Sequence, residues 1–287
     1  MPAVVEGPTP APQKTSKAGR NLPAAIGVGV GLLGVLMLGL YVLPPLLALI
    51  AAAAAGLGVW EVCRSLEHGG IRVPRIPAAV GGAALPLAAF IGGSELLIIA
   101  LAVVCTAVIL WRVFGPREGM VLSVMASQFA LTWAGLCMSL AVLLYLTPEG
   151  ASKVLLVILM AVGNDTFGYI AGVLWGRHPM APRISPKKTW EGFAGSMGGS
   201  LIVGSLLGAV LLSTPWWHAT VLAFFLVIVS ALGDFAESMV KRELGVKDMG
   251  DLLPGHGGVM DRIDSVLFAV PVGYVVFELL ALLSRVG

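Results

Sequence analysis

Long apolar runs separated by short polar segments make up most of this 287-residue chain. A helix of about twenty apolar residues is long enough to cross the hydrocarbon core of a lipid bilayer. The boundary between the third and fourth run rests on Gly92 and Gly93. The pattern predicts an all-α, polytopic integral membrane protein with about nine transmembrane helices. The expected helices span residues 22–43, 46–62, 77–93, 96–111, 120–146, 153–175, 190–213, 216–237 and 263–284.

The distribution of positive charge predicts the orientation of these helices. If the N-terminus lies in the cytosol, every Lys and Arg except Lys153 and Arg285 falls in a cytosolic segment. Cytosolic loops of membrane proteins carry an excess of Lys and Arg, and a miscount of one helix would destroy this asymmetry. We therefore expect a cytosolic N-terminus, cytosolic loops after the second, fourth, sixth and eighth helices, and a location in the cytoplasmic (inner) membrane.

Composition narrows the class of protein further. With 57% hydrophobic and only 12% charged residues, the chain does not have the composition of a soluble globular domain. The net charge of +2 gives no reason to expect a nucleic-acid partner, so the expected surroundings are the lipid bilayer. Cys63, Cys105 and Cys137 fit no metal or disulfide spacing, and we interpret them as core residues.

The chain divides into three regions by composition. Residues 1–20 are rich in proline and basic side chains, which predicts a disordered tail that is either solvated or touches anionic lipid headgroups. Residues 21–146 contain no aspartate and are predicted to be a scaffold of about five transmembrane helices, in which Glu61 is expected to snorkel. Residues 147–287 hold all six aspartates. This last region, with about four helices and two cytosolic loops, is expected to be catalytic.

Acidic side chains occupy unusual positions in the last region. Asp234 begins a polar stripe with Glu237, Ser238 and Lys241 at helical spacing, and it lies well inside its expected helix. Asp165, beside Asn164, also lies deep in a helix, where ionisable groups are costly and often functional. The alternative for Asp165 is a buried acid that hydrogen-bonds two helices together.

The start of the last expected helix carries two more carboxylates, Asp261 and Asp264, on either side of Arg262. A spacing of three puts both on one helix face, although acidic groups also favour a helix N-terminus for electrostatic reasons alone. Together with Asp234 they would make an oxygen-rich site suited to Mg²⁺.

The loop at residues 176–192 is expected to bind phosphate. Lys187 and Lys188 supply positive charge, and either Ser185 or Thr189 can cap the following helix. Free N–H groups at a helix N-terminus, together with lysines, form an anion site. Ordinary positive-inside charge is the alternative explanation for this loop. His256, between glycines, could bind phosphate or move a proton, but a lone loop histidine often does neither.

Three segments together resemble the phosphatidate cytidylyltransferase (CDP-diacylglycerol synthase) family. The segment at residues 238–264 matches the family signature throughout, Ser185-Pro186-Lys187-Lys188-Thr189-Trp190-Glu191-Gly192 resembles a second motif, and Asn164-Asp165 a third. The resemblance covers about residues 160–265, and the N-terminal half is similar only in being helical and membrane-embedded. The matching signature positions are Ser238, Lys241, Arg242, Lys247, Asp248, Gly250, Pro254, His256, Gly257, Gly258, Asp261, Arg262 and Asp264.

The resemblance implies a Mg²⁺-dependent reaction in which CTP and phosphatidic acid give CDP-diacylglycerol and pyrophosphate. Asp234 and Asp261 are the expected principal metal ligands and catalytic residues, with Asp264 assisting and Asp165 a weaker candidate; a second cation is left open. The expected phosphate partners, without a division between CTP and lipid, are Lys187, Lys188, Arg242 and Lys247, together with Lys241 and Arg262, which are also expected to be catalytic. Further residues expected to bind substrate are Asn164, Ser185, Thr189, Ser238 and His256.

Other functions are less consistent with the residues. An ion-coupled transporter would be expected to carry intramembrane polar residues in both halves, and the first half lacks them. A CDP-alcohol phosphatidyltransferase would carry an Asp-Gly-x-x-Ala-Arg motif, which the chain lacks. Small-residue faces such as Gly195/Gly199 and Gly204/Gly208 are compatible either with a homodimer or with packing inside one chain.

Overall fold

The computed structural model describes residues 22–182, 184–212, 215–251 and 257–286. Residues 36–287 form one compact unit, and residues up to Val35 form a separate one. Of the smaller unit, the described part is helical. All contacts discussed below lie within the larger unit. His256 and Pro254, two positions of the signature segment, lie outside the described residues.

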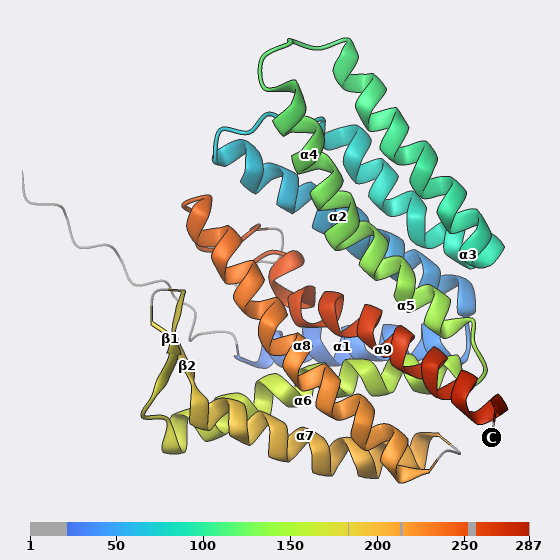
Figure 1. The fold of residues 1–287 in the computed structure, drawn as a ribbon, viewed down its shortest axis with the longest axis vertical. Coiled ribbons are helices and arrows are strands. Elements are labelled where there is room, and N and C mark those ends of the chain that lie inside the picture. The colour runs from blue at the N-terminus through green and yellow to red at the C-terminus, as the bar shows by residue number, and fades with distance from the viewer. Residues whose placement is uncertain (1–21, 183, 213–214, 252–256, 287) are drawn as a thin grey trace, which may run out of the picture. The chain divides into compact units, whose positions relative to one another are not determined.

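Helices form almost all of the described structure (Figure 1). Seven helical segments in this part of the chain are long and apolar enough to cross a membrane, which agrees with the predicted helical, polytopic membrane protein. The elements are α1 (Leu22–Tyr41), α2 (Pro44–His68), α3 (Arg75–Val113), α4 (Met120–Ala130), the π-helical stretch η1 (Leu131–Leu136), α5 (Cys137–Tyr145), α6 (Gly150–Trp175), β1 (Pro179–Ala181), β2 (Ser185–Thr189), α7 (Trp190–Leu211), α8 (Trp216–Glu243) and α9 (Met260–Val286).

The segment α3 reverses direction at Gly92 and Gly93, which divides it into two halves that run side by side (Figure 1). Gly93 has φ +61° and ψ −151°, a combination that is essentially restricted to glycine. Gly81 in the first half packs against the side chain of Val104 in the second. The reversal lies where the sequence separated two expected helices, although the number nine stays a prediction.

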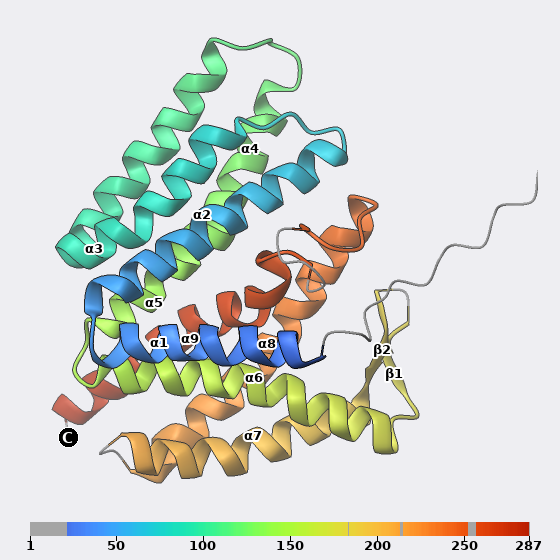
Figure 2. The ribbon, with the colours of Figure 1, turned by 180° about the vertical axis from the view of Figure 1, so that it is seen from behind.

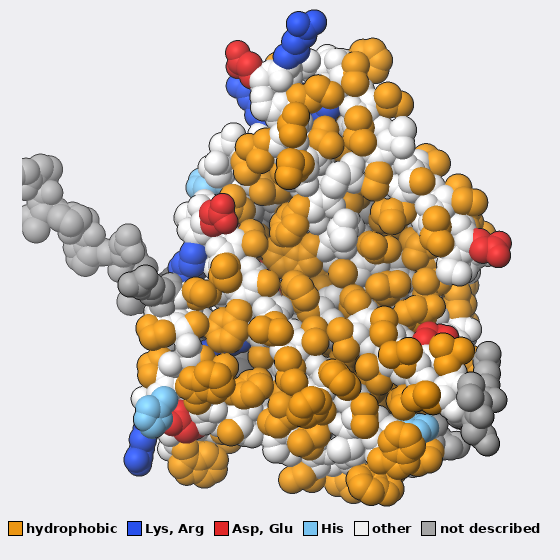
Figure 3. Space-filling model, in the orientation of Figure 1, with side chains coloured by type: hydrophobic (Ala, Val, Ile, Leu, Met, Phe, Trp, Pro, Cys, Tyr) orange, Lys and Arg blue, Asp and Glu red, His pale blue; other side chains and the backbone are white. Residues whose placement is uncertain are grey.

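Two clusters of buried hydrophobic side chains hold the larger unit together. One is formed mainly by α2, α3 and the α4–η1–α5 segment, and the other mainly by α6, α8 and their neighbours. Helix α9 contributes to both, because Met260 and Leu267 lie in the first cluster whereas Ala269 and Phe277 lie in the second. Many of the remaining large apolar side chains are exposed, and they cover most of the face seen in Figure 3. Such a surface is suited to contact with lipid.

Helices α6 and α7 pack closely through small residues. Gly195 of α7 faces Ala171 of α6, and Gly199 faces the Phe167 ring. Gly208 in turn packs against Ala219 of α8. These small-residue faces are therefore used inside one chain, and a homodimer stays a prediction.

The loop between α6 and α7 contains an antiparallel β-hairpin that the sequence analysis did not predict. Strand β1 pairs with β2 through Pro179 and Thr189 and through Ala181 and Ser185. The hairpin projects from the ends of α6 and α7 (Figure 2). Three prolines keep the backbone extended, but a three-residue strand is too short to give an alternating pattern in the sequence.

The reversal in α3 predicts a specific stability difference. Gly93→Ala is expected to lower the free energy of unfolding by about 1–3 kcal/mol, because a Cβ strains the left-handed backbone. Gly198→Ala in α7 is the matched control, since both glycines have open space around the added Cβ and only Gly93 has positive φ. Thermal unfolding in detergent measures both variants. Equal melting temperatures would contradict the assigned backbone conformation.

Candidate functional site

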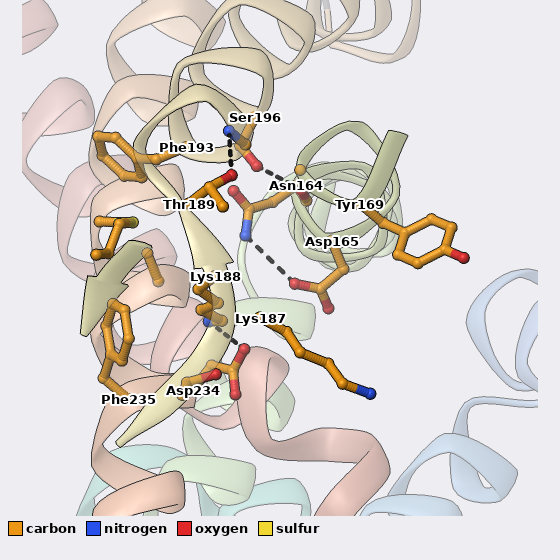
Figure 4. Close-up of a pocket in the computed structure, with 15 residues that line it drawn as sticks. Asn164, Asp165, Tyr169, Lys187, Lys188, Thr189, Phe193, Ser196, Asp234 and Phe235 are labelled. Atoms are coloured by element: carbon orange, nitrogen blue, oxygen red, sulfur yellow. Dashed lines mark hydrogen bonds and ion pairs between the residues drawn. The ribbon is translucent and has the colours of Figure 1, made fainter. Parts of the chain in front are cut away.

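A cavity of about 330 Å³ lies among α6, α7, α8 and the β-hairpin (Figure 4). Three of these elements contribute residues that the sequence pattern predicted as site residues. They are Asn164 and Asp165 from α6, Ser185, Lys187, Lys188 and Thr189 from β2, and Asp234 from α8. Residues from separate segments of the sequence thus meet at one place.

One wall of the cavity is formed by the N-terminus of α7. The Thr189 hydroxyl accepts a hydrogen bond of 3.1 Å from the Gly192 N–H and so forms the N-cap of α7, as expected for either Thr189 or Ser185. Gly192 packs against Gly168 and Gly172 of α6, which brings the two helix backbones close together. The positive end of the α7 dipole therefore points at the cavity.

Both lysines of strand β2 line the same cavity. The exposed Lys187 side chain extends past Asp165, and its ammonium has no ion-pair partner among the residues that the structure describes (Figure 4). Lys188 forms an ion pair with Asp234 and also lies 4.7 Å from the centre of the Phe235 ring. The cavity thus combines one unpaired ammonium with one that already neutralises a carboxylate.

The start of the loop between α6 and α7 is hydrogen-bonded to the first turn of α7. The Glu191 carboxylate accepts hydrogen bonds from the N–H groups of Arg177 (3.1 Å) and His178 (3.2 Å). It also lies 2.5 Å from the His178 ring Nδ1. These contacts close the base of the hairpin and fix β2, with its two lysines, against the helix N-terminus.

Three carboxylates gather beside the cavity. Asp234 and Glu237 of α8 and Asp264 of α9 offer oxygen atoms that all lie within 4.8 Å of one another. We call these three residues the carboxylate cluster. Glu237 is only 1% exposed, and Lys241 lies 3.0 Å from it. Three like charges so close together repel one another strongly unless a proton or a cation intervenes.

Asp165 lies at the edge of the carboxylate cluster. Its carboxylate accepts a hydrogen bond of 3.2 Å from the Ser265 hydroxyl of α9 and one of 3.4 Å from the Asn164 amide. Of the four predicted metal ligands, Asp165 and Asp234 line one cavity, and Asp264 directly precedes Ser265, the hydrogen-bond partner of Asp165.

Asp261, the fourth predicted ligand, has a different environment. Its carboxylate lies 2.5 Å from the Lys241 ammonium and accepts hydrogen bonds from the N–H groups of Met249 (3.1 Å) and Gly258 (2.9 Å). It is not one of the grouped oxygens. These contacts favour a role in holding the loop before α9, and its assignment as a principal metal ligand stays a prediction.

Several predicted phosphate partners do not line the cavity. Arg242, Lys247 and Arg262 are exposed, and Ser238 is half-buried on α8. Lys241 lies instead between Glu237 and Asp261, where it pairs with both. The expected contacts of these residues with substrate stay predictions. The same holds for His256, which lies outside the described residues.

Two buried acids, Glu237 and Glu61, were not predicted as site residues from the sequence. Glu237 was noticed in the polar stripe of α8 but was not named as a site residue, although its spacing from Asp234 was a usable signal. Glu61 was expected to snorkel, and this was wrong, because its side chain is 1% exposed and accepts hydrogen bonds from Val259 and Met260. These partners lie almost 200 positions further along the chain, so local spacing gave no signal.

The chain is similar to known proteins over most of its length. A model of the Cytidylyltransferase family matches residues 23–280. The phosphatidate cytidylyltransferase of Mycobacterium leprae (strain TN) is 36% identical over 302 aligned positions, which cover 98% of this chain and 95% of the relative. The phosphatidate cytidylyltransferase of Mycobacterium bovis (strain ATCC BAA-935 / AF2122/97) is 37% identical over 280 positions, covering 93% of this chain and 92% of the relative. The phosphatidate cytidylyltransferase of Synechocystis sp. (strain ATCC 27184 / PCC 6803 / Kazusa) is 47% identical over 133 positions, which cover 44% of this chain and 45% of the relative.

The N-cap of α7 gives a test of the hydrogen bond between Thr189 and Gly192. Thr189→Val removes the hydroxyl that accepts from Gly192, so it is expected to lower the free energy of unfolding by about 1 kcal/mol. Thr189→Ser keeps the acceptor and is the control. Thermal unfolding of the purified variants in detergent measures the difference. If valine and serine were equally well tolerated, Thr189 would not act as the cap.

Proposed function

This chain belongs to the Cytidylyltransferase family, and we propose that it transfers the CMP group of CTP to phosphatidic acid, giving CDP-diacylglycerol and pyrophosphate. The observation that carries the proposal is one cavity that a helix N-terminus, two lysines and Asp234 line together. Asp234 belongs to the carboxylate cluster, of which Glu237 is buried. The names of the three relatives support the same substrate and reaction.

The proposed reaction brings two polyanions together. An oxygen of the lipid phosphate attacks the α-phosphorus of CTP, and the bond from that phosphorus to the oxygen of the β-phosphate breaks. The products are CDP-diacylglycerol and pyrophosphate. A phosphate monoester is largely ionised near neutral pH, so the attacking oxygen needs no strong general base. The main task of the protein is to position the two substrates and offset their charge.

Basic groups around the cavity are placed for this task. The positive end of the α7 dipole and the Lys187 ammonium, which has no ion-pair partner among the described residues, are suited to binding phosphate oxygens. Lys188 pairs with Asp234, so an arriving phosphate would compete with that carboxylate for the same ammonium. Of the two helix ends, that of α7 lines the cavity through Gly192, whereas the first N–H groups of α9 donate to Glu61.

The carboxylate cluster fits a hard divalent cation, because Mg²⁺ prefers oxygen ligands and is commonly held by carboxylates together with substrate phosphates. We propose that Asp234, Glu237 and Asp264 hold Mg²⁺, whereas Asp165, which lines the same cavity as Asp234, stays a weaker candidate. When bound, Mg²⁺ would neutralise phosphate charge and favour departure of pyrophosphate. Lys241 keeps Glu237 in place from the other side. A second cation stays open.

The proposed orientation follows from charge. Nine membrane crossings, with the two halves of α3 counted separately, would put the N-terminus, the β-hairpin and the loop before α9 in the cytosol. CTP is a cytosolic solute, so a cavity on this side of the inner membrane is accessible to it. Phosphatidic acid would enter sideways from the cytosolic leaflet, past the exposed apolar side chains of Tyr169 and Trp190.

The proposal is tested with the purified full-length protein in detergent, supplied with CTP, phosphatidic acid and Mg²⁺. We expect CDP-diacylglycerol and pyrophosphate in equal amounts. Glu237→Gln and Asp264→Asn are each expected to lower kcat by about 100-fold, because each removes a charged oxygen ligand of the proposed cation. Chelation of the cation should abolish turnover.

Glu243→Gln is the matched control, since Glu243 lies on the same helix as Glu237 but is exposed at its end. It should retain the wild-type rate. A folded wild-type protein that forms no CDP-lipid would contradict the proposed reaction. Full activity in both cluster variants would contradict the proposed metal ligands instead.

A further inference from the structure

Helix α2, in the half of the chain expected to be only scaffold, makes polar contacts with the loop before α9. Glu61, Arg64 and Ser65 lie on one face of α2, at helical spacings of three and four. We infer that Glu61 is a positioning residue for the proposed reaction: it fixes the first turn of α9 and thereby places Asp264 in the carboxylate cluster. The inference rests on the proposed function.

The Glu61 carboxylate takes the place of an N-cap for α9. One oxygen accepts a hydrogen bond of 3.0 Å from the Val259 N–H, and the other accepts one of 2.8 Å from the Met260 N–H. The first N–H groups of a helix have no partners inside the helix, and a negative charge there also interacts favourably with the helix dipole. Since Glu61 is 1% exposed, water does not compete for these bonds.

The two other polar residues of this face hold the same loop at a second place. The Ser65 hydroxyl donates a hydrogen bond of 3.0 Å to the Met249 carbonyl oxygen. Arg64 lies 2.5 Å from the Asp251 carboxylate. Helix α2 therefore contacts the loop both where it leaves α8 and where it enters α9.

Space for the Glu61 carboxylate is provided by two glycines of the signature segment. A Cβ added to Gly250 would overlap the carboxylate, and one added to Gly258 would lie 2.5 Å from its Oε2 and 2.8 Å from the Gly250 nitrogen. Real Cβ atoms do not approach other atoms so closely. The absence of side chains at Gly250 and Gly258 is thus explained by a residue far away in the sequence.

A chain of contacts links Glu61 to the proposed site. Asp261, in the first turn of α9, accepts from Met249 and Gly258 and pairs with Lys241. Lys241 pairs in turn with Glu237 of the carboxylate cluster. Asp264 follows Asp261 by one helical turn and belongs to the same cluster. A shift of the first turn of α9 therefore displaces Asp264 and loosens the contacts around Glu237.

The test compares Glu61→Gln, Glu61→Asp and the control Glu67→Gln. The glutamine keeps the size of the side chain but points an NH₂ donor at a backbone N–H donor. Glu67 lies on the same helix and makes a half-exposed ion pair with Arg75 at 3.4 Å. Hydrogen exchange of peptides covering residues 257–262 reports on the α9 turn without requiring catalysis, and exchange in α6 and α7 serves as the internal reference.

For Glu61→Gln we expect faster exchange at residues 257–262 and unchanged exchange in α6 and α7. We also expect kcat to fall by about 10–100-fold, with a higher Mg²⁺ concentration for half-maximal activity and a smaller change in the KM for CTP. Glu61→Asp should recover part of the rate, because it restores the charged acceptor. Glu67→Gln should match the wild type in every readout.

Two outcomes would overturn the inference. Unchanged exchange at residues 257–262 would show that Glu61 does not hold the turn. Faster exchange with wild-type kcat and Mg²⁺ dependence would show that the turn is held but does not position the site. A wild-type protein without transferase activity would contradict the proposed function, and the exchange experiment would still decide whether Glu61 holds α9.

Discussion

The close approach of Asp234, Glu237 and Asp264 is the interaction on which the rest of the site depends. Three carboxylates so close together repel one another strongly unless positive charge lies nearby, and the one on Glu237 is also buried. The chain provides part of that charge itself, since Lys188 pairs with Asp234 and Lys241 pairs with Glu237. The remaining repulsion is what makes the cluster suited to a cation, and the adjacent α7 N-terminus is suited to the phosphates that a cation would bring with it.

Helix α9 connects this cluster to the whole fold. Its buried side chains join both hydrophobic clusters, and its first turn is held by Glu61 of α2. The N-terminal half is therefore more than a lipid-facing support. The first N–H groups of α9 donate to Glu61, whereas the N-terminus of α7, capped by Thr189, lies beside the cavity.

The sequence predicted those features of the fold and the site that depend on residues close together in the chain. Apolar runs predicted the helices, the paired glycines at 92–93 marked the reversal of α3, and Thr189 was expected as one of two caps of α7. The acids Asp234 and Asp264 and the lysines of β2 were expected near one site, and the structure brings them to one cavity or its edge. Each of these predictions used information from within one helix or one loop.

The missed features depend on contacts between distant segments. Glu61 looked like an acid at a helix end, because nothing near it in the sequence shows that Val259 and Met260 need an acceptor. Asp261 and Asp264 share a helix face in sequence terms, yet Lys241 and the Met249 N–H draw Asp261 away from the grouped oxygens. The hairpin of β1 and β2 was missed because its strands are too short for a periodic signal.

The most direct test of this account is the position of a bound divalent cation. Crystals of the protein soaked with Mn²⁺ would show it by anomalous scattering, in the absence and presence of CTP. The account predicts one peak within about 2.0–2.3 Å of oxygens of Asp234, Glu237 and Asp264, since hard cations of this size bind carboxylates at such distances. A peak bound by Asp261 with Glu237 left uncoordinated would contradict the proposed ligand set, and no peak near α8 and α9 would contradict a metal site in this cluster.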